Sequence, residues 1–195
     1  MSEITGLLLA AGSSSRFGGH KLLQVIRGKP LVLHSAASLQ PCDRVIVVVR
    51  QNDHPLQDLL QSAGIETIIN HEAEQGMGRS IACGVKASEG SDGWCVLPGD
   101  MPFVDTNTTM RIAEQMRNGA ELVAPFYHGQ RGHPVCFSRR YREQLMALQG
   151  DTGARDIVRV EHEVLTKVIA SDPWILVDID MPEDLVGLDM QPLKD

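Results

Sequence analysis

The sequence has no surplus of basic residues: 18 lysines and arginines stand against 25 aspartates and glutamates, which leaves a net charge of −7. An acidic chain is a poor candidate for general nucleic-acid binding. No apolar run reaches the roughly 18 residues that a membrane-spanning helix needs, and residues 1–4 lack the basic start of a signal peptide. We therefore expect a soluble, cytoplasmic protein that binds neither nucleic acid nor membrane.

Two common fingerprints of nucleotide binding are also missing. There is no GxxxxGK[ST] phosphate loop, because Lys21 follows His20 and precedes Leu22. No GxGxxG follows the first apolar run, so a redox enzyme with a dinucleotide cofactor is not supported. The cysteines form no CxxC pair and have no histidines at zinc-ligand spacing, so we expect buried thiols in a reducing compartment. They are Cys42, Cys83, Cys95 and Cys136.

The chain does contain a regular alternation of strand-like apolar runs and helix-like segments. Expected strands cover residues 4–11, 44–50, 65–69, 94–97, 122–125, 135–137, 166–170 and 175–178. Expected helices cover residues 30–39, 54–63, 79–88, 107–117, 139–148 and a short segment from 183. This alternation predicts a three-layer, Rossmann-like α/β fold with a mainly parallel central sheet covered on both faces. Without a linker or repeat, residues 1–195 are expected to form one domain.

The loop after the first expected strand is rich in glycine, serine and positive charge. It reads LAAGSSSRFGGHK over residues 9–21. Ligands of such sheets bind beyond the carboxyl ends of the strands. Glycines expose backbone N–H groups, and Arg16 and Lys21 add two cations, which together suit a triphosphate. The residues expected around the nucleotide here are Leu9, Ala10, Ala11, Gly12, Ser13, Ser14, Ser15 and Gly18.

This loop resembles the signature LAAGxSxRxGxxK of the sugar-nucleotide-type nucleotidyltransferases. Within that superfamily, ordered motifs between residues 7 and 185 are similar to those of the molybdenum cofactor nucleotidyltransferases, with Phe17 where methionine is usual. The resemblance implies the nucleotidyltransferase form of the α/β fold. It also implies a reaction in which a phosphomonoester attacks the α-phosphorus of a nucleoside triphosphate, with Arg16 and Lys21 as catalytic residues that hold the β and γ phosphates.

A second glycine-rich segment, Gly76-Met77-Gly78-Arg79-Ser80, opens an expected helix. The exposed N–H groups of a helix N-terminus make a good site for an anion or the edge of a base. The alternative is a flexible turn with a serine cap. Because the family uses this loop around the base and ribose, the resemblance implies nucleotide contacts from Gly76, Met77, Gly78 and Ser80.

A stiff loop with one carboxylate follows the strand at 94–97. It reads LPGDMP over residues 97–102 and holds Asp100 between two prolines. A carboxylate fixed at the end of a strand suits a divalent metal, and the alternative is an Asx turn or a cap for the next helix. The resemblance implies that Asp100 is a catalytic residue and a ligand of Mg²⁺, for which Mn²⁺ can substitute, and that Pro98 and Gly99 contact the nucleotide.

The last expected strand ends in an acidic run, VDIDMPED, over residues 177–184. In an extended chain Asp178 and Asp180 point the same way, and two carboxylates on one face repel unless a cation joins them. We expect Asp180 to complete the metal site with Asp100, with Asp178 as the second choice. Glu183 and Asp184 are expected to cap the final helix.

Two later segments carry the expected contacts to the acceptor substrate. The run GHPV, residues 132–135, places His133 before a proline, which favours an extended backbone. The run GDTGAR, residues 150–155, reads as a helix start with Asp151 or Thr152 as N-cap. A structural histidine and a surface arginine are the alternatives. The resemblance implies that His133 and Arg155 bind the acceptor and its phosphate.

The end of the first strand bears on the choice of nucleotide. Residues 9–12 read LAAG, as in the cytidylyl-transferring relatives, whereas guanylyl-transferring ones read LAGG. The resemblance therefore implies that CMP passes from CTP to molybdopterin carrying molybdenum, giving molybdopterin cytosine dinucleotide and pyrophosphate, with a client molybdoenzyme as partner. Guanylyl transfer, transfer to a sugar or alditol phosphate, and a non-catalytic molybdopterin carrier stay open. A carrier would have no need of paired metal carboxylates.

Overall fold

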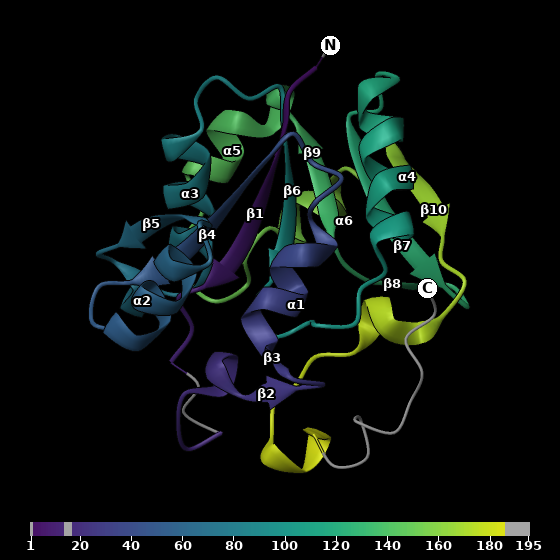
Figure 1. The fold of residues 1–195 in the computed structure, drawn as a ribbon. Helices are drawn as coiled ribbons and strands as arrows, with labels where there is room; N and C mark the ends of the chain where they lie inside the picture. Colours follow the sequence, from purple (N-terminus) through teal and green to yellow (C-terminus); the bar gives the residue numbers. More distant parts are fainter. Residues whose placement is uncertain (1, 14–16, 186–195) are drawn as a thin grey trace.

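A central sheet dominates the computed structural model, which describes residues 2–13 and 17–185. Its strands are β1 (Ile4–Ala10), β4 (Arg44–Arg50), β5 (Glu66–Asn70), β6 (Gly93–Pro98), β7 (Leu122–Tyr127), β8 (Gln130–Arg131), β9 (Val135–Ser138) and β10 (Leu165–Ile169). Their order is β10-β7-β9-β6-β1-β4-β5, and β8 pairs with β7 (Figure 1). The neighbours β1–β4, β1–β6, β4–β5 and β7–β10 are parallel, whereas β9 is antiparallel to β6 and β7. The predicted mainly parallel α/β sheet is confirmed.

Helices cover both faces of this sheet (Figure 1). They are α1 (Leu31–Ser38), α2 (His54–Ser62), α3 (Met77–Ala87), α4 (Thr106–Arg117), α5 (Arg142–Met146) and α6 (Arg155–Val160). Successive strand residues point to opposite faces. Leu8 therefore belongs to a core with α1, α2 and α4, whereas its neighbour Leu7 belongs to a second core with α3, α5 and α6. The predicted three layers follow from this alternation.

The expected strand at 175–178 does not form. A short 3-10 helix, Pro173–Leu176, occupies this place, and the Asp172 carboxylate accepts a hydrogen bond from the Trp174 N–H group (3.1 Å). The local bond and the fixed φ of Pro173 favour a turn over extension. The chain after this turn still bonds to the Asp100 loop at one position, where Ile179 N donates to the Asp100 carbonyl (2.9 Å).

Two expected helices also differ from the prediction. The segment 139–148 divides into a 3-10 turn, Arg139–Tyr141, and the short α5. Helix α6 begins after Ala154, with no side-chain cap, so the predicted capping role of Asp151 or Thr152 is wrong. The Thr152 carbonyl instead accepts from Arg155 N (3.3 Å), and the turn closes through the backbone alone.

Smaller elements complete the chain. The hairpin β2 (Val25–Ile26) and β3 (Lys29–Pro30) leads into α1, and 3-10 turns lie at Lys21–Leu23, Ala73–Gln75 and Pro182–Leu185. All four cysteines are free; Cys42, Cys95 and Cys136 are buried and Cys83 is partly buried. Among the described residues, no helix has the length and apolar character that crossing a membrane requires.

Candidate active site

Two loops begin side by side at the carboxyl ends of β1 and β6. The strands pair in parallel, with Leu9 opposite Pro98, and Gly99 N donates to the Leu9 carbonyl (2.8 Å). A Cβ atom at Gly99 would lie 2.9 Å from that same oxygen, so only glycine allows this approach. The pairing carries the first loop and the Asp100 loop to one place, as the positions of the strands predicted.

Lys21 forms the electrostatic centre of this place. Its side chain is only 10% exposed, and Nζ donates to Asp100 Oδ2 (2.8 Å) and Asp180 Oδ1 (3.2 Å). Burial disfavours the ammonium ion, but the two carboxylates more than offset this and raise the pKa of Lys21. Lys21 is therefore a buried, permanently charged cation between two acidic groups that lie far apart in the sequence.

A third carboxylate joins the pair. Asp100, Asp178 and Asp180 each place an oxygen so that these atoms lie within 4.8 Å of one another. Desolvation, followed by repulsion from Asp100, raises the pKa of Asp178. Three hard oxygen ligands at this spacing fit a divalent cation such as Mg²⁺ or Mn²⁺. Such a cation would also relieve the repulsion that disfavours the ionised form of Asp178. The structure thus brings together the predicted ligand Asp180 and the second choice, Asp178.

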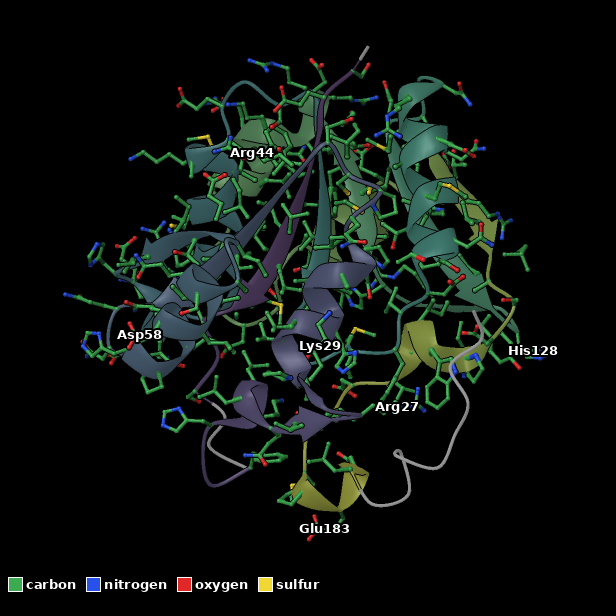
Figure 2. The ribbon with its side chains drawn as sticks, in the orientation of Figure 1. Arg27, Lys29, Arg44, Asp58, His128 and Glu183 are labelled. Carbon is green, nitrogen blue, oxygen red and sulfur yellow. The ribbon has the colours of Figure 1, made fainter. Side chains whose placement is uncertain are left out.

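The segment that carries Asp178 and Asp180 is fixed by hydrogen bonds to Asp184. The Asp184 carboxylate accepts hydrogen bonds from the N–H groups of Asp180 and Met181 (2.8 Å each), and these bonds lower its pKa. Glu183, which was also expected to cap this turn, points outward from the lower end of the molecule (Figure 2). The helix cap considered for Asp100 belongs instead to Asp105, whose side chain accepts from the first N–H groups of α4.

A cavity of about 380 Å³ opens beside the first loop. Its lining includes Gly12, Ser13, Gly18, Gly19, His20, Lys21 and, from the end of β4, Arg50, Asn52 and Asp53. The Arg50 guanidinium donates to the Ala11 carbonyl (3.2 and 3.3 Å) and adds a cation that the sequence analysis missed. The available signal was its position as the last residue of the β-branched run 44–50. Ser14, Ser15 and Arg16 lie outside the described residues.

The glycines at the start of α3 have a different neighbour from the one expected. Gly78 N donates to the Gly150 carbonyl (2.8 Å), and a Cβ atom at Gly78 would lie 2.8 Å from Gln149 N. Ser80 is buried and accepts a hydrogen bond from the Asn70 amide (3.1 Å). Backbone packing against 149–151 accounts for Gly76 and Gly78, and their predicted contact with a nucleotide stays a prediction, as does that of Ser80.

A second cavity, of about 140 Å³, lies on the other side of β1 and β6. It brings together residues expected to bind the nucleotide (Leu9, Met77 and Pro98) and residues expected to bind the acceptor (His133 and Arg155), together with Asp151 and Arg131. Arg131 belongs to no motif that predicted a role for it. Of the other predicted residues, Ala10 and Ala11 are buried at the end of β1.

His133 lies between the second cavity and the carboxylates. Burial, reinforced by the positive charge of Arg131, lowers its pKa to about 4, whereas Asp100 acts in the opposite direction. Its Nδ1 atom is shielded from solvent and has no hydrogen-bond partner among the described residues. Burial therefore favours the neutral ring, and the predicted contact of His133 with the acceptor stays a prediction.

The fold and this arrangement define a nucleoside triphosphate transferase. Residues 6–168 match the MobA-like NTP transferase domain, and the chain belongs to that family.

Curated relatives extend along nearly the whole chain. The chain is 29% identical to the molybdenum cofactor cytidylyltransferase of Escherichia coli strain K12 over 189 residues, which cover 95% of both chains. It is 28% identical to the nicotine blue oxidoreductase of Paenarthrobacter nicotinovorans over 195 residues, 95% of this chain and 96% of the relative. It is 27% identical to a probable molybdenum cofactor guanylyltransferase of Bacillus cereus strain ZK / E33L, covering 88% and 86%. These names differ in substrate and even in reaction.

Solved structures show the same fold. Rv0371c from Mycobacterium tuberculosis H37Rv superposes with a TM-score of 0.82 at 23% identity, over 98% of this chain and all of that one. A nucleotidyl transferase from Methanothermobacter thermautotroptrophicus gives a TM-score of 0.82 at 23% identity, over 97% of each chain.

Proposed function

We propose that this protein transfers CMP from CTP to the terminal phosphate of molybdopterin that carries molybdenum. The phosphate oxygen of the acceptor bonds to the α-phosphorus, the bond from that phosphorus to the β-phosphate oxygen breaks, and pyrophosphate leaves. The products are molybdopterin cytosine dinucleotide and pyrophosphate. A client molybdoenzyme and a cytoplasmic location belong to the same proposal.

The observation that carries the proposal is the contact of Lys21 with two of the three clustered carboxylates beside the first-loop cavity. A carrier protein needs to bind its cargo but has no reason to gather Asp100, Asp178 and Asp180 within 4.8 Å. Nucleotidyl transfer does need a cluster of carboxylates that can hold a cation. The barrier of this reaction lies in bringing anions together and holding them in line. Family membership supports the same conclusion.

The roles of the chain's own groups follow from charge. Lys21 faces both the carboxylates and the first-loop cavity. A divalent cation held by Asp100, Asp178 and Asp180 supplies positive charge to phosphate oxygens when bound. Were these carboxylates neutralised in this way, the Lys21 ammonium would be available to the triphosphate, the role that the sequence predicts for Lys21 together with Arg16. Lys21 thereby links metal binding to nucleotide binding.

The choice of CTP rests on the Ala10-Ala11-Gly12 end of β1 and on the similarity to the Escherichia coli cytidylyltransferase. Similarity of the same order to a probable guanylyltransferase favours GTP as the second candidate. Transfer to molybdopterin is common to both candidates.

Pyrophosphate release tests the proposal directly. The full chain is incubated with Mg²⁺, molybdenum-loaded molybdopterin and each of the four ribonucleoside triphosphates in turn. We expect release with CTP, and about a thousandfold slower release from the Asp100→Asn variant. Release with GTP alone would replace CTP in the proposal and keep the chemistry. Cofactor binding without release from any nucleotide would replace the enzyme with a carrier.

A further inference from the structure

Two serines of α1, Ser35 and Ser38, are buried in apolar surroundings. The buried residues beside them in the sequence, Leu31, Val32 and Leu39, belong to the apolar core on that face of the sheet. A hydroxyl group in such a place costs free energy unless it is hydrogen-bonded. Each of the two serines therefore needs a partner.

Both partners lie outside the helix, in the loop that carries Asp100. Ser35 Oγ donates to the Gly99 carbonyl (2.8 Å), and Ser38 Oγ donates to the Val104 carbonyl (2.7 Å). A serine inside a helix commonly donates to the carbonyl four residues earlier. Here those carbonyls are farther away, at 3.4 Å from Ser35 Oγ and 3.3 Å from Ser38 Oγ. Because a hydroxyl group has one proton to donate, the shorter bonds to the loop take precedence.

A third hydrogen bond holds the same loop. Ile179 N donates to the Asp100 carbonyl (2.9 Å), and Ile179 stands between Asp178 and Asp180 in the sequence. Because a peptide group is planar, the Gly99 carbonyl lies in one plane with the N and Cα atoms of Asp100, and the Asp100 carbonyl belongs to the next plane. Both peptide planes that flank the Asp100 Cα atom are thus held, one by α1 and the other by the segment around Ile179.

We propose that Ser35 and Ser38 are positioning residues for the carboxylate cluster. They act through the backbone of residues 99–104 and hold Asp100 where one cation can also reach the other two carboxylates. Outer partners of this kind orient the ligands of a metal and contribute to its affinity. The assignment rests on the proposed function for the cation and the reaction, whereas the hydrogen bonds to the loop stand without it.

The first test measures metal binding without turnover. Mn²⁺ is titrated into the full chain by calorimetry, in the absence of nucleotide. Ser35→Ala removes the donor to the peptide group that precedes Asp100 and should weaken Mn²⁺ binding about tenfold. Ser38→Ala releases the far end of the loop and should weaken Mn²⁺ binding by a smaller factor.

The matched control is Ser88→Ala. Ser88 is also buried, and its hydroxyl accepts from Trp94 Nε1 (2.9 Å), but Trp94 lies near the start of β6, at the opposite end of that strand from Asp100. This variant should lose thermal stability, as Ser35→Ala does, and keep the wild-type affinity for Mn²⁺. Unchanged Mn²⁺ affinity in Ser35→Ala, or an equal loss in Ser88→Ala, would overturn the positioning role.

The second test separates this role from the proposed function. Amide hydrogen exchange, followed by mass spectrometry, reports on the loop in the absence of any cation. Ser35→Ala should speed exchange in residues 99–104 about tenfold and leave the strand 44–50 unchanged. Unchanged exchange in residues 99–104 would overturn the proposal. Faster exchange in Ser35→Ala, with no binding of Mn²⁺ by the wild-type chain, would keep the positioning of Asp100 and contradict the cation, and with it the proposed function.

Discussion

Two charged regions share the carboxyl edge of the sheet, and they differ in how their charge is balanced. At the first loop, Lys21 and the carboxylates Asp100 and Asp180 neutralise one another directly. In the second cavity, Arg131 and Arg155 stand together without a carboxylate partner among the described residues. The first region is balanced within the protein, whereas in the second the charge of the exposed Arg155 is left to solvent.

Because of this difference, we expect the two regions to respond to a ligand in different ways. We expect a balanced cluster to exchange partners when a ligand binds, so that cation binding there is coupled to the release of Lys21. An unbalanced pair responds simply by gaining a counter-ion, so binding there adds stability without rearrangement. The following substitutions change one region at a time and test whether the two regions respond differently.

Asp100→Asn should have the largest effect. It removes one of three metal ligands and the nearest partner of Lys21, so transfer activity should fall about a thousandfold, or roughly 4 kcal/mol in the barrier. Steady-state pyrophosphate release measures this loss. Asp58→Asn is the control, because Asp58 is an exposed residue of α2 that lines neither cavity, and it should keep full activity. Retained activity in Asp100→Asn would contradict the role of the carboxylate cluster.

His133 lies between the two regions and should make stability depend on pH. Its pKa is about 4 in the folded protein against 6.5 in the unfolded chain. Between these values the unfolded chain binds a proton that the folded protein excludes, so stability falls as the pH drops. The penalty should reach about 3 kcal/mol near pH 4.

Urea unfolding from pH 7 to pH 4 measures this penalty as the difference between the wild-type chain and His133→Gln. The variant should lose less stability on acidification. His162→Gln, which changes an exposed histidine, should behave as the wild type does. Parallel curves for all three proteins would show that His133 titrates in the folded protein as it does in the unfolded chain.

Lys21→Met tests the balanced region from its cationic side. Methionine keeps much of the length of the side chain and removes the charge that competes for Asp100 and Asp180. Without nucleotide, Mn²⁺ should bind about tenfold more tightly, whereas CTP should bind more weakly. Calorimetric titration measures both affinities. Weaker Mn²⁺ binding would show that Lys21 organises the carboxylates and does not compete for them.

Gly78→Ala should change stability and leave the charges of both regions as they are. The new methyl group would meet Gln149 N at 2.8 Å and push the 149–151 segment outward, at a cost of about 1–3 kcal/mol. Thermal unfolding measures the change. Gly90→Ala is the control, because a Cβ atom there meets nothing within 4 Å. Equal stability of the two variants would mean that the contact between α3 and 149–151 opens freely.

The sequence predicted well wherever one local pattern decided the outcome. Buried apolar runs such as 44–50 and 94–97 form strands, as predicted. The position of Asp100 just after β6 follows from the second of these runs. Asp178 and Asp180 were expected to share a face of a strand. They do gather at Asp100, but through the Ile179 bond to the Asp100 carbonyl and the bonds to Asp184, in a segment that is no strand. The expected result was obtained for a different physical reason.

Sequence reasoning could not find features that depend on contacts between distant segments. The approach of Arg131 to Arg155 requires the β8 hairpin and the start of α6 to meet, and no local pattern encodes that meeting. The glycines at 76 and 78 indicated a close approach, but a ligand and another backbone segment leave the same mark in a sequence. Only the structure identifies the 149–151 segment as the neighbour.

The reactivity of the buried cysteines can report how often the central sheet opens. Cys95 and Cys136 stand opposite each other on β6 and β9, and Cys42 lies against Cys95 in the same core. Burial raises the pKa of Cys95 and Cys136, and the contact with Cys95 together with burial raises that of Cys42, so the reactive thiolate form is scarce in the native state. An alkylating reagent should therefore modify the partly buried Cys83 first. Labelling of the other three would then record how often the sheet comes apart, with no engineered probe.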